Sequence, residues 1–339
     1  MKRWLWNSVW LLVIASLLYF LLKDINFIEL YLILKYARPT YIILAFLSVG
    51  LTYFVWAIRW TYVFGRVFRG DYWFLINMLL AGTFVNTITP GPAVGGEPVR
   101  AHFLSKRYKK STTSMLAIVL SDKFYQLIVL AILSIFGIFF IFIYFKISNT
   151  LKYVLEGVLL LVLVISGMAI YVLLRKFNFN IGHIFKKLHF FAFFKKKFKK
   201  EEEIEKFINT KMKIFLTIFR KSVKNKKVMA QAFFLAILFW LFNFLATYFL
   251  FLAFGFKINF LFVVIVVPLG IVIGDLSFSP GGIGITELTM TLLFSAMGIF
   301  VPLALLVSFL SRIIYYFFSL VLGSCSLWYL KRVTHDSLN

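Results

Sequence analysis

Five charged side chains that could handle a charged ligand lie inside strongly apolar runs of the chain. The acids are Glu97, Asp275 and Glu287, and the bases are Lys123 and Arg312. A charged side chain at the centre of a bilayer costs at least ~2.5–3.5 kcal/mol unless it is paired or in contact with water. We therefore expect these residues to face a polar cavity, where they could bind a phosphate, bind a cationic group or transfer protons.

Two similar helix breakers interrupt these apolar runs, at residues 87–97 and 277–287. They align without a gap, since Glu287 stands 190 positions after Glu97. The other matched pairs are Pro90 with Pro280 and Gly91 with Gly281. Unwound backbone persists in a membrane only where it is buried in protein or lines a polar cavity. The helix that restarts after each break presents free N–H groups, which favour an anion such as phosphate.

The acids near the breaks differ in their local partners. Glu97 has Arg100 three residues later, at pairing distance on a helix. Glu287 has no such neighbour, so we expect its partner to be Arg312 or Lys123 from elsewhere in the bundle. A plain helix-capping role is the alternative for both glutamates. Asp275 lies deepest in an apolar run, and we expect it to line the cavity.

Charges also interrupt the predicted full spans. Asp122 and Lys123 are expected either to face the cavity or to form an interfacial pair with the lysine reaching outward. Arg312 aligns with Asp122 at the same offset of 190 residues that relates the two breaks. We expect it to form a buried salt bridge or to contact a phosphate. Arg59 and Trp60 are expected to be interfacial anchors.

The composition predicts an all-α polytopic membrane protein. Hydrophobic residues make up 62% of the 339 residues, well above the level in soluble domains. Several apolar runs reach the roughly 20 residues that cross a bilayer. We predict about six full spans and two shorter apolar segments that end at the breaks. The spans are 4–22, 41–64, 113–144, 151–174, 228–252 and 302–330, and the shorter segments are 73–89 and 259–279.

The distribution of basic residues predicts an inverted-topology repeat within one integral membrane domain, 1–339. Repeat 1 covers 41–144 and repeat 2 covers 228–330. We expect each repeat to contain a re-entrant helical hairpin, 73–104 in the first and 259–300 in the second. The basic clusters then lie inside, which predicts a multi-pass protein of the plasma (cytoplasmic) membrane with both termini in the cytoplasm. Paired discontinuous helices in such repeats are typical of carriers with a central binding site.

The net charge of +24 is concentrated in a predicted cytoplasmic loop, 175–227. This segment holds seventeen Lys or Arg and four Glu, as cytoplasmic loops of membrane proteins often do. Its basic residues would also be attracted to anionic lipids. We therefore do not expect nucleic acid as a partner. The apolar run after Arg3 has no clear cleavage site, so we expect a retained first helix instead of a signal peptide.

Other chemistry has little support in the sequence. The four histidines show no metal-ligand spacing, and neither a Walker loop nor a Gly-x-Ser-x-Gly element occurs. The single cysteine, Cys325, is expected to be a packing residue. We expect no catalytic residue, metal or cofactor, and no nucleotide-driven pump.

The motifs around the breaks resemble the lysylphosphatidylglycerol synthase transmembrane-region family, the flippase-like membrane half of the multiple peptide resistance factor. They are Asn86-x-x-x-Pro90, Gly95-Gly96-Glu97-Pro-x-Arg100, Asp122-Lys123, Asp275 and Pro280-Gly-Gly-x-Gly284-x-x-Glu287. In the larger members, the resemblance implies, this domain moves an aminoacylated phosphatidylglycerol to the outer leaflet. Their separate synthase domain is not expected in this chain, so aminoacyl transfer is not carried over.

These observations predict a transporter that moves an anionic lipid between leaflets by alternating access. The lipid could be aminoacyl-phosphatidylglycerol, another phospholipid or an isoprenoid phosphate. One alternative is an intramembrane lipid-modifying transferase, and another is a membrane subunit that recruits a lipid-synthesising enzyme at the cytoplasmic face. A homo-oligomer stays open. The predicted substrate-binding residues are Asn86, Pro90, Gly91, Gly95, Gly96, Glu97, Arg100, Asp122, Lys123, Asp275, Pro280, Gly281, Gly282, Gly284, Glu287 and Arg312.

Overall fold

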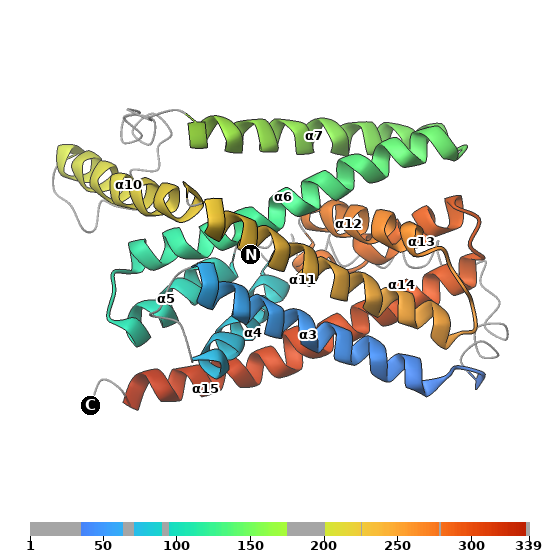
Figure 1. Ribbon diagram of the computed structural model, residues 1–339, viewed down its shortest axis with the longest axis horizontal. Coiled ribbons are helices and arrows are strands. Elements are labelled where there is room, and N and C mark those ends of the chain that lie inside the picture. Colours follow the sequence, from blue (N-terminus) through green and yellow to red (C-terminus); the bar gives the residue numbers. More distant parts are fainter. Residues whose placement is uncertain are drawn as a thin grey trace, which may run out of the picture.

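The computed structural model describes residues 35–63, 71–89, 95–174, 201–224, 226–277 and 279–336, and most of these residues are helical (Figure 1). The elements are α3 (Pro39–Val63), α4 (Tyr72–Ile88), α5 (Gly96–Tyr108), α6 (Thr112–Tyr144), α7 (Asn149–Leu174), α10 (Glu201–Lys224), α11 (Lys226–Ala253), α12 (Phe260–Leu276), η2 (Pro280–Gly282), α13 (Ile285–Ala296), α14 (Val301–Tyr316), η3 (Phe317–Leu322) and α15 (Gly323–Asp336). No strand occurs within these ranges.

Five of the helices are long and apolar enough to cross a bilayer. They are Pro39–Tyr62, Thr112–Tyr144, Asn149–Gly167, Lys226–Ala253 and Val301–Val333. These confirm five of the predicted spans, and the sixth, 4–22, lies outside the described residues. The two shorter apolar helices, Tyr72–Ile88 and Phe260–Leu276, match the predicted short segments closely. The chain is therefore a membrane protein with several apolar helices.

Local sequence signals set several helix starts. The Ser111 hydroxyl accepts a hydrogen bond from the Ser114 N–H (3.2 Å) and caps α6. The Asn259 side chain accepts one from the Leu261 N–H (3.0 Å) and caps α12. Each bond satisfies one of the amides that the first turn of a helix leaves without an intrahelical partner. Pro302 lies in the first turn of α14, where its missing N–H costs nothing.

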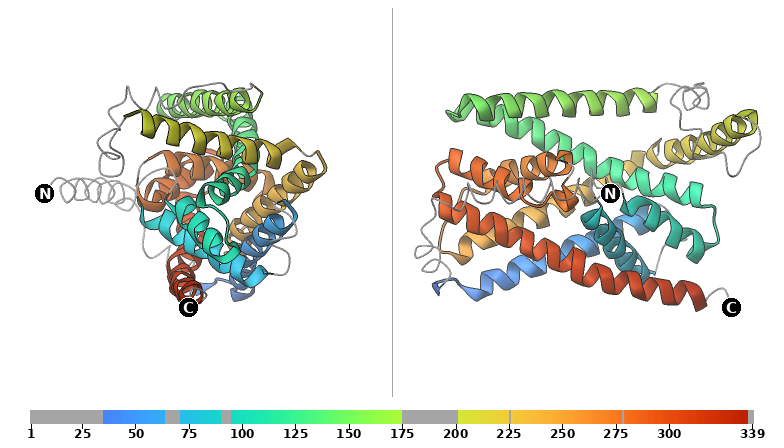
Figure 2. Two further views of the ribbon diagram at one scale, coloured as in Figure 1. Left: turned by 90° about the vertical axis from the view of Figure 1, so that its left-hand side faces the viewer. Right: turned by 180° about the vertical axis from the view of Figure 1, so that it is seen from behind.

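The long and the short helices pack into one bundle (Figures 1 and 2). Helices α3 and α11 pack against each other along much of their length, and α6 contacts α5, α10 and α12. The α4–α5 pair lies toward one end of the bundle and the α12–α13 pair toward the other (Figures 1 and 2). Helix α10 and the C-terminal end of α15 lie at the same end as α5 (Figure 1).

Both short pairs are antiparallel hairpins held together at glycines. In the first hairpin, Gly82 packs against the Arg100 side chain, and Gly96 packs against the backbone carbonyl of Gly82. In the second hairpin, Gly274 lies against Thr286, and Gly270 lies against Met290. Because glycine has no Cβ, the helices of each hairpin approach more closely than larger residues would allow.

The ends of the two hairpins meet inside the bundle. A methyl group at Gly281 would lie 3.0 Å from Thr87 Cγ2 and 3.1 Å from the Thr87 carbonyl oxygen. Gly281, Gly282 and Gly284 have φ values of 59°, 71° and 84°, a region that side-chain-bearing residues rarely adopt. The turn from α12 into α13 therefore needs these glycines. The tip of the first hairpin, including Pro90 and Gly91, lies outside the described residues.

Part of the predicted basic cytoplasmic loop 175–227 is helical. Residues 201–224 form the helix α10, which packs mainly on α6. Phe219 makes an edge contact with Phe124 of α6 (ring centroids 5.7 Å apart) and stacks on Phe215 one turn earlier (5.9 Å). The cause is an apolar stripe at helical spacing, which the high charge of the segment conceals.

We predict that Gly96→Ala destabilises the first hairpin by about 1–3 kcal/mol, because the added methyl group would overlap the Gly82 carbonyl. The measurement is the thermal unfolding midpoint of the purified protein in detergent. Gly157→Ala is the matched control, since a methyl group there would have no heavy atom within 4 Å. Equal midpoints for the two variants would contradict the close packing of α4 on α5.

Candidate substrate-binding cavity

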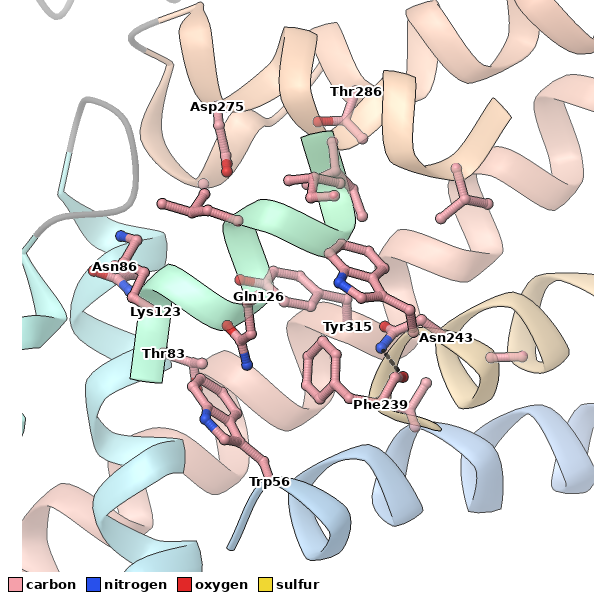
Figure 3. Close-up of a pocket in the computed structure, with 18 of the residues that line it drawn as sticks. Trp56, Thr83, Asn86, Lys123, Gln126, Phe239, Asn243, Asp275, Thr286 and Tyr315 are labelled. Carbon is pink, nitrogen blue, oxygen red and sulfur yellow. Dashed lines mark hydrogen bonds between the residues drawn. The ribbon is translucent and has the colours of Figure 1, made fainter. Parts of the chain in front are cut away.

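A cavity of about 230 Å³ lies where the two hairpins meet α3, α6, α11 and α14 (Figure 3). Three acidic and three basic side chains line it. Eight of the predicted site residues contribute to the lining. They are Asn86, Glu97, Arg100, Asp122, Lys123, Asp275, Gly281 and Arg312. The cavity thus brings together residues from both breaks and from the spans that follow them.

A buried ion pair between α3 and α6 forms one wall. Arg59 Nε donates to Asp122 Oδ1 (2.7 Å), and Arg59 Nη2 donates to Asp122 Oδ2 (3.0 Å). The indole N–H of Trp56 donates to the same carboxylate (2.5 Å). Both charged side chains are almost fully buried, at 0% and 2% exposure. A bidentate pair with a third donor offsets much of the cost of desolvating the two charges.

Arg59 and Trp60 are therefore not interfacial anchors, and that prediction is wrong. Both side chains have no exposed surface. The alternative of an interfacial Asp122–Lys123 pair is also wrong, because Asp122 pairs with Arg59 and Lys123 pairs with Glu97. The reason is the same in each case, since a partner from another helix holds the charge inside the bundle instead of at its surface.

Glu97 joins the first hairpin to α6. Lys123 Nζ contacts Glu97 Oε1 at 2.9 Å, and Arg100 Nη1 lies 3.7 Å from the same oxygen. Arg100 also donates to the Leu79 carbonyl (3.3 Å) and lies over the Trp56 ring, 4.6 Å from its centroid. The expected Glu97–Arg100 contact is confirmed, but Lys123 is the closer partner.

Glu287 joins the second hairpin to α14. Arg312 Nε donates to Glu287 Oε1 (3.4 Å), and the Tyr316 hydroxyl donates to the same oxygen (3.0 Å). Glu287 Oε2 accepts from the Gly284 N–H (2.8 Å), so this glutamate caps α13 as well. Arg312 also donates to the Gly281 carbonyl at the hairpin end. Of the two partners predicted for Glu287, Arg312 and Lys123, the structure shows Arg312.

The two glutamate clusters repeat one arrangement. In each, a carboxylate from the first turn of the hairpin's second helix binds a cation from the next span. Each glutamate neutralises its cation in a low-dielectric interior, where an unpaired charge would strongly destabilise the fold. Lys123 and Arg312 stay partly exposed to the cavity, at 24% and 12%. Both cations are thus within reach of a ligand.

Asp275 differs from the other acids around the cavity. It lies at the end of α12, is half-buried, and forms no hydrogen bond or ion pair within the ranges that the structure describes. It points into the cavity from the side of the second hairpin, as does Thr286 (Figure 3). The expectation that Asp275 lines the cavity is confirmed.

One amide at each of the two helix restarts already has an acceptor within the protein. The Gly96 N–H donates to Asn86 Oδ1 (2.5 Å), and the Gly284 N–H donates to Glu287. Side-chain oxygens of the protein thus satisfy two of the N–H donors that were expected to bind an anion. The cationic side chains are therefore the better candidates for holding a phosphate.

The remaining predicted residues hold the backbone in place without lining the cavity. Gly95 and Gly96 allow the close approach of α4 and α5, and Pro280 begins the η2 turn. Gly282 and Gly284 supply its left-handed conformations. Glu287 does not line the cavity itself, but it pairs with Arg312, which does. Pro90 and Gly91 lie outside the described residues.

Several lining residues were not predicted. They are Trp56, Gln126, Phe239, Trp240, Asn243 and Tyr315. Most are aromatic, and in a chain with 43 Phe, 16 Tyr and 8 Trp an aromatic residue carries little positional information. Asn243 was detectable, because a lone amide in an apolar span usually faces the protein interior.

These features define a polytopic α-helical membrane protein with a charged internal cavity. Within the described part of the chain, no group of three His, Cys, Asp or Glu residues could hold a metal ion.

The chain belongs to the lysylphosphatidylglycerol synthase TM region family, which matches residues 8–323. It is 27% identical over 292 residues to the UPF0104 membrane protein PH1989 of Pyrococcus horikoshii, covering 84% of this chain and 85% of that protein. It is also 27% identical over 354 residues to the UPF0104 membrane protein MJ1595 of Methanocaldococcus jannaschii, covering 98% and 97%. A UPF0104 membrane protein of Methanothermobacter thermautotrophicus is 27% identical over 315 residues, with 90% of each chain covered. The resemblance inferred from the two breaks is confirmed.

We predict that Arg59→Met lowers the unfolding free energy by about 3–5 kcal/mol, because it leaves Asp122 as an uncompensated buried charge. The double variant Arg59→Met/Asp122→Leu should recover much of this loss. Thermal or denaturant unfolding in detergent measures both. Arg107→Met is the control, since the Arg107–Asp71 pair is largely exposed and should contribute less than about 1 kcal/mol. A double variant as unstable as Arg59→Met would contradict this account.

Proposed function

We propose that the protein moves an anionic lipid between the two leaflets, with the lipid phosphate held in the charged cavity. The observation that carries this proposal is the meeting of two hairpin ends around three acids and three bases. Such a concentration of charge inside an apolar bundle usually marks the path of a polar ligand. The candidate lipids are aminoacyl-phosphatidylglycerol, other phospholipids and isoprenoid phosphates.

The proposed mechanism is an exchange of partners at Lys123 and Arg312. Without lipid, Glu97 and Glu287 neutralise these two cations. An entering phosphate competes for the same N–H donors, and its oxygens suit the planar guanidinium of Arg312. The displaced carboxylates then loosen the contacts of each hairpin with the following span. Ligand binding is thereby coupled to movement of the hairpins.

The proposed topology is an inverted repeat with two re-entrant hairpins. Three observations support it: the gapless offset of 190 residues, the similar Glu97 and Glu287 clusters, and the positions of the hairpins toward opposite ends of the bundle (Figure 1). In this arrangement α10 and the C-terminus lie on the cytoplasmic side of the plasma membrane. Rocking one repeat against the other would expose the cavity to each leaflet in turn.

We predict that Arg312→Met and Lys123→Met each lower the rate of lipid translocation about tenfold or more, because a lost charge-assisted hydrogen bond to a buried anion costs ~1.5–3 kcal/mol. The assay uses proteoliposomes with a phosphatidylglycerol labelled on one acyl chain by a dithionite-sensitive fluorophore. Lys257→Met, an exposed lysine between α11 and α12, should leave the rate unchanged.

The same assay separates the alternatives. Wild-type rates equal to those of empty vesicles, for each lipid class tried, would contradict translocation. A covalently altered lipid detected by mass spectrometry would instead indicate the intramembrane transferase. A membrane subunit without transport activity predicts a lipid-synthesising enzyme that co-purifies with the wild-type protein.

A further inference from the structure

One side of the cavity is mainly aromatic, and the guanidinium groups of Arg100 and Arg312 lie over two of its rings, Trp56 and Tyr315. Four aromatic residues form it, and we call them the aromatic wall. They are Trp56 of α3, Phe239 and Trp240 of α11, and Tyr315 of α14. The Phe239 ring makes edge contacts with Trp56 (centroids 5.6 Å apart) and Trp240 (5.7 Å), so these three rings are continuous. Figure 3 shows Gln126 between Trp56 and Phe239 on one side and Asp275 on the other.

Polar groups beside the aromatic wall lack hydrogen-bond partners. Trp240 is 94% buried, since its relative exposure is 6%, and its indole N–H has no acceptor among the residues that the structure describes. The Gln126 side-chain amide nitrogen is also buried without a partner in those ranges. On the charged side of the cavity, the Glu97 Oε2 atom is a buried acceptor that has no hydrogen-bond donor among the described residues. A buried polar group without a partner costs about 1–3 kcal/mol, so these atoms are suited to bind a ligand.

The type of unpartnered atom restricts the ligand chemistry. An indole N–H donates only, so its partner must carry lone pairs. An ammonium group has none and could pair only with the acceptors of the cavity. A hydroxyl group both donates and accepts, and it can therefore satisfy the Trp240 N–H, the Gln126 amide and the Glu97 carboxylate alike. The C–H faces of a sugar or cyclitol ring can also pack against aromatic rings.

We propose that the aromatic wall binds a polyhydroxylated group, such as a sugar or cyclitol, attached to the phosphate that the charged side holds. This inference rests on the proposed function for the phosphate, and it narrows the substrate to lipids with a polyol headgroup. Two other lining residues are additional hydrogen-bond partners for its hydroxyls: Asp275, across the cavity from Trp56 and Phe239 (Figure 3), and Asn243, whose amide N–H already donates to the Phe239 carbonyl (2.9 Å). An amine headgroup would leave the Trp240 N–H without an acceptor.

The test is a binding titration by native mass spectrometry of the intact protein in mild detergent. The probes are phosphatidylinositol, phosphatidylethanolamine and phosphatidic acid with identical acyl chains. Phosphatidylinositol should bind about tenfold or more tightly than the other two, because each buried donor that stays unsatisfied costs ~1–3 kcal/mol. Soluble inositol phosphate is a fourth probe, and it should bind far more weakly because it lacks acyl chains.

Two variants assign the preference to the aromatic wall. Trp240→Phe keeps a ring but removes the N–H, and it should weaken phosphatidylinositol binding about tenfold while leaving phosphatidic acid unchanged. Gln126→Met tests the second donor in the same way, should Trp240→Phe fold poorly. Trp328→Phe is the matched control, because Trp328 is 57% exposed and lies outside the cavity.

The outcomes separate this inference from the proposed function. Equal binding of phosphatidic acid and phosphatidylinositol by the wild-type protein would overturn the polyol site and leave lipid translocation intact. An equal loss of both lipids in Trp240→Phe would overturn it as well. Failure of all three lipids to bind would overturn the proposed function itself. Tight binding of soluble inositol phosphate would support the polyol site and contradict a lipid substrate.

Discussion

The structure depends on the absence of water from the hydrocarbon core, which obliges the protein to satisfy its own charges and broken helix ends. Arg59 and Asp122 neutralise each other between α3 and α6, and Trp56 supplies a third hydrogen bond. Glu97 and Glu287 each neutralise a cation of the following span. Asn86 and Glu287 accept from the amides at the helix restarts. The polar interior is thus a set of paired groups around a cavity of about 230 Å³.

This pairing links the fold to the proposed activity. The ion pairs that stabilise the hairpins are also the contacts that an anionic ligand would compete for, so binding and hairpin movement share the same side chains. Arg59, by contrast, does not line the cavity, and its buried pair with Asp122 is a fixed connection between two spans. Asp275 and Trp240 carry polar atoms that the described protein does not pair, and they are the groups most directly available to a ligand.

Much of this fold could be predicted from the sequence, because apolar run length is a direct physical signal in membrane proteins. The predicted spans 113–144 and 228–252 correspond to helices Thr112–Tyr144 and Lys226–Ala253. The breaks were recognisable since Pro and Gly rarely occur together inside a stable span. The Glu287–Arg312 pair was predictable, as each buried charge requires a partner and few candidates exist.

Other features depend on which helices become neighbours, and no local pattern reports that. Arg59 lies near the end of its span, so position alone suggested the interface, whereas the fold places Asp122 beside it. The helix α10 was missed because its charge was more prominent than its apolar stripe. The aromatic wall joins residues from three helices, and only the tertiary structure brings Trp56, Phe239 and Tyr315 to one cavity.

The most direct test of this account is whether the two hairpin ends meet in a membrane. The variant carries Thr87→Cys and Gly281→Cys in a Cys325→Ser background. A protease site is inserted between residues 175 and 200, so that cleavage separates the two cysteines unless a disulfide joins them. The variant is oxidised in native membranes and then cleaved. A disulfide needs Cβ atoms about 3.5–4.5 Å apart, and a methyl group at Gly281 would already lie 3.0 Å from Thr87 Cγ2. Gly157→Cys/Gly281→Cys is the control, since it carries the same strained substitution at Gly281, α7 packs mainly on α6, and a methyl group at Gly157 would have no heavy atom within 4 Å. We predict that the Thr87–Gly281 fragments stay joined under non-reducing conditions while the control fragments separate. Separation of both pairs alike would contradict the central claim.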